Sequence, residues 1–177
     1  MREIVDRHRH ACEGFSVVVQ QSDGRWDNAS PCNEWDARGV AEHVIGFHDA
    51  LLLRPLGLKP DRPKRDPGAR WAVTVPAIIS ALERASTEGS DSGVDLNRLL
   101  PVLTTDVLVH TWDLARAVNA DPQLDPEQCE VSFEVVRPND KRLRASGMFG
   151  PAVLVPEDAD AATRLVAFLG RDPGWTA

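Results

Sequence analysis

The sequence predicts an all-α fold, because apolar residues recur at helical spacing in several segments that turn-forming residues separate. Aspartates stand where helix N-caps are expected, as at Asp36 and Asp125. The chain has 177 residues, of which 42% are hydrophobic, and this is enough for a sizeable core. We therefore expect residues 1–177 to form a single helical domain.

The first two helices are expected at residues 3–20 and 37–54. The first repeats apolar residues at helical spacing until a Ser-Asp-Gly turn at residues 22–24. The second follows Asp36, whose residue type favours the N-cap position. The apolar face of the second helix predicts an inward stripe that contains Val40, His43, Val44, Phe47 and Leu51.

Residues 55–70 hold four prolines among a cluster of charged residues. This composition predicts a solvated loop, and a lid or a clamp for an anionic substrate is the functional alternative. The third helix is expected at residues 75–88, with Pro76 in its first turn, where the missing N–H is harmless. A flexible break is expected at residues 88–93.

The last three helices are expected at residues 102–118, 126–137 and 158–169. Pro126 suits the first position of the middle one, and Asp158 or Asp160 can cap the last one. Residues 148–156 form a continuous apolar run with two prolines. This run predicts a buried extended crossing or a short edge strand.

The stretch Thr104–Ala117 carries the residues that point to a function. Asp106, His110 and Asp113 are spaced i, i+4 and i+7, so they share one face of a helix. A carboxylate and an imidazole one turn apart can both reach one cation. One helix supplies only part of a coordination shell, and His43 is the best candidate from another helix. We therefore expect His43, Asp106 and His110 to hold a divalent metal. Asp113 suits the role of acceptor for the free ring N–H of a ligand histidine.

These residues also have ordinary structural interpretations. His43 could be a core histidine bonded to a carbonyl, and Asp106 could lie in water at a helix end. A buried carboxylate is costly unless it is paired or bound to a metal, which favours the metal interpretation of Asp106. His48 is rotated by about 140° from His43, so the two should not share a metal. His8 is expected on the outer face or partly buried, and Cys32 is expected to be a small buried residue, with a thiol near the site as the alternative.

The charge and the apolar runs exclude some partners. A net charge of −7 argues against nucleic acid, since phosphate binding needs a basic surface. No run approaches the about 18 apolar residues of a membrane span, and the first residues lack the apolar core of a signal peptide. We expect a cytoplasmic protein with no membrane partner. Cys12, Cys32 and Cys129 are widely spaced and odd in number, which predicts reduced thiols.

Two stretches, SPCNEWDARGVAEHVIG and LTTDVLVHTWDLARA, resemble the metal-binding domain of mycothiol-dependent maleylpyruvate isomerase, within the DinB-like superfamily. The closing segment MFGPAVLVPEDADAATRLVAFLGRDP resembles a subgroup of small, single-domain members. The resemblance covers nearly the whole chain and implies a DinB-like four-helix bundle with short extra C-terminal elements. It implies a divalent metal at the inner face, with ligands that correspond to His43, Asp106 and His110. The isomerase has glutamate where this chain has Asp106, and its substrate-binding C-terminal domain is not matched, so its substrate chemistry is not carried over.

Two histidines and one carboxylate leave open positions on a metal, which is typical of a catalytic site. We expect zinc, with nickel, cobalt, iron or manganese as alternatives. The resemblance implies a mycothiol-type thiol and an electrophilic small molecule as partners, and hence a thiol-dependent S-transferase or isomerase. A metal-dependent hydrolase and a non-catalytic metal-binding or sensory bundle are the alternatives. A homodimer through an apolar helix face stays open.

Overall fold

The structure is a computed structural model that describes residues 1–88, 93–145, 147 and 149–177. In these ranges the regular secondary structure is helical, apart from an isolated bridge between Ala29 and Asp36. The prediction of an all-α bundle is therefore confirmed. The four long helices are α1 (Arg2–Gln20), α2 (Ala37–His48), α3 (Pro67–Glu88) and α4 (Leu96–Ala117). Among the described residues, no helix combines the length and the apolar character that a membrane span requires.

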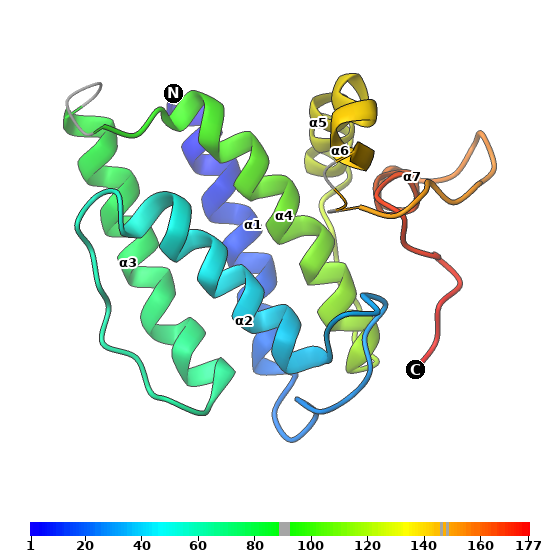
Figure 1. Ribbon diagram of the computed structural model, residues 1–177, viewed down its shortest axis with the longest axis horizontal. Coiled ribbons are helices and arrows are strands. Elements are labelled where there is room, and N and C mark those ends of the chain that lie inside the picture. The colour runs from blue at the N-terminus through cyan, green and yellow to red at the C-terminus, as the bar shows by residue number, and fades with distance from the viewer. Residues whose placement is uncertain (89–92, 146, 148) are drawn as a thin grey trace.

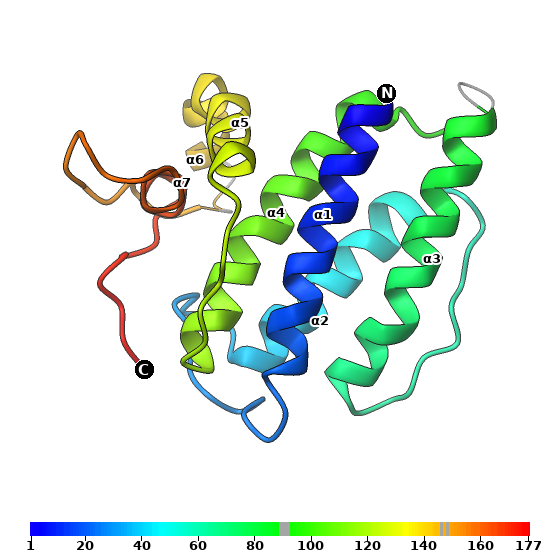
Figure 2. The same cartoon turned by 180° about the vertical axis from the view of Figure 1, so that it is seen from behind.

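The four long helices form a bundle in which each packs against two others. Helix α1 contacts α4 and α3, and α2 contacts the same two helices (Figure 1; Figure 2). Helix α2 continues into a wider turn, the π-helix η1 (Asp49–Leu53). Both α2 and α3 begin at the lower edge of Figure 1, so residues 54–66 run back along the bundle between them. Such a long crossover connection is one of the known topologies of four-helix bundles.

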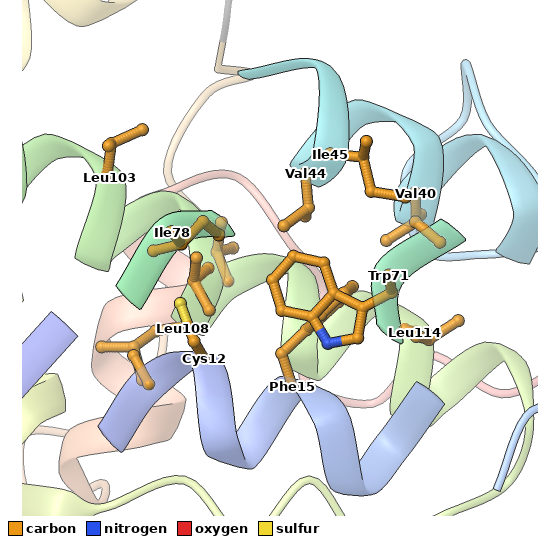
Figure 3. Packing of buried hydrophobic residues seen from close by; sticks show 14 of the residues in the cluster. Cys12, Phe15, Val40, Val44, Ile45, Trp71, Ile78, Leu103, Leu108 and Leu114 are labelled. Carbon is orange, nitrogen blue, oxygen red and sulfur yellow. The ribbon is translucent and has the colours of Figure 1, made fainter. Parts of the chain in front are cut away.

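The core lies where the four long helices meet. Phe15 of α1 and Trp71 of α3 are buried at its centre, edge to face, with 4.8 Å between ring centroids. Val44 of α2 and Leu114 of α4 are buried in the same cluster as these two rings (Figure 3). The indole nitrogen of Trp71 donates to Ser16 Oγ at 2.8 Å, so the buried ring keeps a hydrogen-bond partner. The core thus ties α2 and α4, which carry the predicted ligands, to the rest of the bundle.

The buried face of α2 differs from the predicted stripe. Val40 and Val44 are buried as expected, but His43 and Phe47 are only partly buried and Leu51 is exposed. Because α2 packs against both α3 and α4, its inward face is centred on another set of residues. These residues are Ala41, Ile45, His48 and Leu52. His43 therefore lies at the border of the core.

Helix α3 begins earlier than predicted. The Asp66 carboxylate accepts hydrogen bonds from the backbone N–H groups of Gly68 and Ala69, at 2.9 and 3.2 Å. Pro67 occupies the first helical position, where proline is favoured. Pro76 is therefore inside the helix, not in its first turn. The missing N–H of Pro76 is tolerated because apolar residues on both sides of it pack into the core.

The crossover before α3 is tied to the bundle. Arg62 donates to both carboxylate oxygens of Asp49 at 2.7 and 2.9 Å, and to the Thr74 hydroxyl at 2.7 Å. Arg38 donates to the carbonyl of Arg65 at 2.7 Å. Arg62 thus ties the segment to the bundle, while most of residues 57–66 are exposed, as the prediction of a solvated loop requires.

Helix α4 also begins earlier than predicted, at Leu96. The Asp95 side chain caps it by accepting from the backbone N–H groups of Asn97 and Arg98. Pro101 therefore lies inside this helix, whereas the predicted helix began only after it, at residue 102. The proline again sits in a segment whose neighbours, Leu100 and Leu103, are buried.

The C-terminal elements pack beside α4. They are α5 (Pro126–Val136), the 3-10 turn η3 (Arg137–Asn139), α6 (Asp140–Ala145) and α7 (Ala161–Phe168), and α5 and α7 pack on each other and on α4. Asp160 caps α7 through the N–H of Thr163 at 2.8 Å. In the described part of residues 148–156 there is no strand, and Leu154 is 98% exposed, so the predicted buried crossing is wrong there. Met148 and most of the predicted break at 88–93 lie outside the described residues.

Candidate metal centre

The three predicted ligands come together between α2 and α4. Potential donor atoms of His43, Asp106 and His110 all lie within 4.8 Å of one another. His43 Nε2 is 3.0 Å from Asp106 Oδ1, and His110 Nε2 is 3.5 Å from the same oxygen. The Asp106 and His110 side chains meet because they stand one turn apart on α4. The geometry brings together the residues that the sequence selected, and their role as ligands stays a prediction.

One carboxylate oxygen at this site has no partner. Asp106 Oδ2 is buried and makes no hydrogen bond within the described part of the chain, whereas Oδ1 faces both histidines. A buried carboxylate oxygen without a partner is costly, typically by about 1–3 kcal/mol or more for a charged group. A cation beside this oxygen would remove that penalty. The residues present therefore fit a bound metal ion.

A fixed chain of side chains orients His110. Its Nδ1–H donates to Asp113 Oδ2 at 2.9 Å, which leaves Nε2 directed toward Asp106. Asp113 in turn accepts two bonds from Arg171, at 2.9 Å from Nη2 and 3.2 Å from Nε. Asp113 and Arg171 are both buried. This arrangement is typical of metal-ligand histidines, whose second ring nitrogen is held by a carboxylate.

Arg171 is a residue that the sequence pattern did not single out. It follows Asp113 by 58 residues and reaches the site from beyond α7. Arg116, which follows Asp113 by only three residues, makes other contacts. Its guanidinium lies 5.2 Å from the centroid of the Trp112 ring and donates to the carbonyl of Pro173. No local spacing could have identified Arg171, because its partner is distant in sequence.

Aromatic rings hold His43 and leave one side of the site open. The imidazole is stacked between Trp35 and Phe47, with ring centroids 4.3 and 5.4 Å away. The side chain of His43 is 26% exposed, against 12% for Asp106 and 5% for His110. The site therefore meets solvent on the His43 side. An ion held there would have room for a further ligand from solution.

The position of Trp35 depends on the turn before α2. Ser30 Oγ donates to the Trp35 carbonyl at 2.6 Å, and the Trp35 N–H donates to the Cys32 carbonyl at 3.0 Å. A Cβ on Gly39 would lie only 2.8 Å from the Cβ of Trp35, so this close approach requires glycine. The SPCNEW stretch and the start of α2 thus place the aromatic ring against His43.

The charges of the site are strongly coupled. Burial by itself would lower the pKa of His110, but the carboxylates of Asp106 and Asp113 raise this pKa to about 9. Burial would raise the pKa of Asp106, but the charge and hydrogen bonds of His110 and His43 hold it well below its usual range. Without a cation, the site is therefore an imidazolium facing a carboxylate. A metal ion that binds His110 Nε2 must displace a proton.

Two further sequence predictions need correction. His8 was expected on the outer face or partly buried, but it is fully buried, in contact with Cys12 and His48. Cys32 was expected to be buried, but it is partly exposed. As predicted, His48 does not join His43, because it points from α2 into the core toward α1.

Comparison with known proteins finds distant relatives that cover almost the whole chain. Two proteins from Mycobacterium tuberculosis, described as uncharacterized protein Rv0738 (strain H37Rv) and uncharacterized protein MT0763 (strain CDC 1551), are each 27% identical over 175 residues. Each alignment covers 93% of this chain and 95% of the relative. No family model matches the chain. No solved structure matches it either.

Proposed function

We propose that the protein binds a divalent metal ion through His43, Asp106 and His110 and acts as a thiol-dependent transferase or isomerase. The observation that carries the metal site is the buried, unpartnered Oδ2 of Asp106, which lies beside two imidazoles. Two imidazoles and one carboxylate suit zinc, and we propose zinc as the ion. The motifs around His43 and His110 support membership of the DinB-like superfamily.

The surroundings of the site favour a catalytic role over a closed structural one. Three protein ligands leave at least one position for a molecule from solution. The exposed side of His43 gives such a molecule access, while Trp35 and Phe47 supply an apolar wall. Asp113 and Arg171 hold His110 in one orientation, so this ligand would need no rearrangement when substrate binds.

We propose a thiol of the mycothiol type because the sequence resembles the isomerase domain. A divalent ion in this site would lower the pKa of a bound thiol, and the thiolate is the reactive nucleophile. In an S-transfer the sulfur forms a bond to an electrophilic carbon, and the thiol proton leaves with a leaving group or is taken up by the product. No oxidant or reductant is consumed. We propose a cytoplasmic setting, where thiols stay reduced.

Metal analysis of protein purified without an affinity tag or a chelator tests the site. We expect about one equivalent of divalent metal in the wild type and much less in His43→Ala and Asp106→Asn. His10→Ala is the matched control, because His10 is a histidine whose side chain is 59% exposed and lies outside the site. An equal metal content in His43→Ala and His10→Ala would refute the site. The site would also be refuted if wild-type protein held no metal after reconstitution with zinc, nickel and manganese.

The thiol-dependent activity needs a separate test. Loaded protein is assayed with low-molecular-weight thiols and a panel of electrophiles, and thiol consumption is followed. We expect turnover with the wild type and the His10→Ala control, and loss of turnover in Asp106→Asn. Turnover that persists after the metal has been removed would contradict thiol activation at this site.

A further inference from the structure

A second group of potential ligands lies in the core, away from solvent. His8 and Cys12 stand one turn apart on α1, and His48 reaches them from the end of α2. His8 Nε2 is 3.2 Å from His48 Nε2 and 3.7 Å from Cys12 Sγ. All three residues are buried. This group shares no residue with His43, Asp106 and His110.

The spacing of the donor atoms fits one shared ion. With bonds of about 2.0–2.1 Å to nitrogen and about 2.3 Å to sulfur, and angles of about 120° around a three-coordinate ion, two nitrogens lie about 3.6 Å apart and a nitrogen and a sulfur about 3.8 Å apart. The His8–Cys12 separation of 3.7 Å is close to this value, the His8–His48 separation of 3.2 Å is shorter, and all three donor atoms lie within 4.8 Å of one another. An ion among the three atoms would require the two imidazole nitrogens to move slightly apart.

The Nδ1 atoms of both histidines have hydrogen-bond partners. If each Nδ1 carries the ring proton and donates it, each Nε2 has a free lone pair for a metal ion. His48 Nδ1–H donates to the Val44 carbonyl at 2.7 Å, so its Nε2 carries no proton when the ring is neutral. His8 Nδ1 lies 3.1 Å from Thr104 Oγ1 and can donate to it. With both rings in this tautomer, the two Nε2 atoms carry lone pairs and lie within 4.8 Å of each other and of the Cys12 sulfur. Metal-ligand histidines commonly have the second ring nitrogen bonded in this way.

We infer that His8, Cys12 and His48 form a second metal site, which takes a soft monovalent ion, copper(I). A thiolate with two imidazoles is a soft donor set, which copper(I) favours. The described residues offer no fourth His, Cys, Asp or Glu to this group, which suits a three-coordinate ion. A monovalent ion and one thiolate are together neutral, and a neutral unit is far less costly in an apolar core than a net charge.

The test is copper(I) retention by the full chain after refolding. Because the site is buried, an ion enters when the bundle opens, so the protein is refolded with copper(I) and a reductant, and parallel samples are refolded with zinc. A chromogenic copper(I) chelator then removes weakly held ion. The variants are Cys12→Ala and Cys12→Ser, and Cys129→Ala is the matched control because Cys129 is a buried cysteine of α5.

Wild type and Cys129→Ala should each retain about one equivalent of copper and show near-ultraviolet absorption from a sulfur–copper bond. Both Cys12 variants should lose the ion and the absorption while keeping the helical circular dichroism of the wild type. Asp106→Asn should retain copper, which separates this site from the first one. Equal retention by Cys12→Ser and Cys129→Ala would overturn the inference, as would no retention by the wild type. Zinc, and not copper, retained by Asp106→Asn and lost when Cys12→Ser is added to that variant would overturn the choice of ion.

Discussion

Asp113→Asn is the substitution that tests how the candidate metal centre is built. The Asp113 carboxylate is buried and joins two partners, since it accepts from His110 Nδ1 and from the Arg171 guanidinium. Asparagine has nearly the same shape but no charge. The change therefore removes the counter-charge of a buried arginine without making a cavity.

The expected loss of stability follows from this burial. Breaking a buried ion pair by neutralising one partner typically costs about 3–5 kcal/mol, because the other charge stays buried and unpaired. We expect Asp113→Asn to lower the free energy of unfolding by this amount. If this loss comes from the unpaired charge of Arg171, the double variant Asp113→Asn, Arg171→Met should lose less free energy of unfolding than the two single variants added together. The variant should also bind the divalent metal about 10–100-fold more weakly, because His110 loses its orienting acceptor.

Two assays on the same protein separate these effects. Urea unfolding of the metal-free protein gives the change in the free energy of unfolding, and competition with a chromogenic chelator gives the metal affinity. Glu134→Gln is the control, because the Arg137–Glu134 pair is exposed at 59% and 52%. An exposed pair of this kind contributes about 1 kcal/mol or less. If Asp113→Asn unfolds like Glu134→Gln and binds metal like the wild type, the proposed role of the Asp113–Arg171 pair is wrong.

Two further predictions concern pH and backbone conformation. The pKa of His110 is raised from 6.5 to about 9, so its contribution to the stability of metal-free protein is complete below pH 6.5 and is lost as the pH rises through about 9. Urea unfolding should show a loss of up to about 3 kcal/mol over this range, and a flat profile would contradict the charge assignment. Gly170→Ala should destabilise the protein by more than about 1 kcal/mol, seen as a lower melting temperature. Gly170 has φ +85°, and an added Cβ would lie 3.0 Å from the backbone of Gly150. Gly14→Ala in α1, where the added Cβ meets nothing within 4 Å, should not destabilise the protein, and an equal loss in both variants would refute this explanation.

Local signals predicted the helices well where capping and apolar spacing agreed. Asp36 and Asp125 cap α2 and α5 as expected. The starts of α3 and α4 were placed too late because Pro76 and Pro101 look like boundaries in isolation. The lost N–H bond at each proline is offset by packing with other helices, which the sequence around the proline does not show. Asp66 and Asp95 were the local signals that could have corrected both starts.

The site could be predicted to the extent that its residues share one helix face. Asp106, His110 and Asp113 follow from helical spacing alone. Their partner Arg171 does not, since the contact depends on how the segment after α7 packs against α4. The same limit applies to His8, because a histidine on α1 looks ordinary until the structure places His48 beside it.

The contact between Arg171 and Asp113 also affects how the site forms during synthesis. Arg171 is made 58 residues after its partner. At about 5–20 residues per second, this corresponds to a delay of about 3–12 s. In that interval α1–α4 can already pack, and the buried Asp113 carboxylate has His110 as a partner but lacks its arginine. The Asp113–Arg171 contact that holds His110 in the candidate metal centre is therefore completed only when the segment after α7 docks.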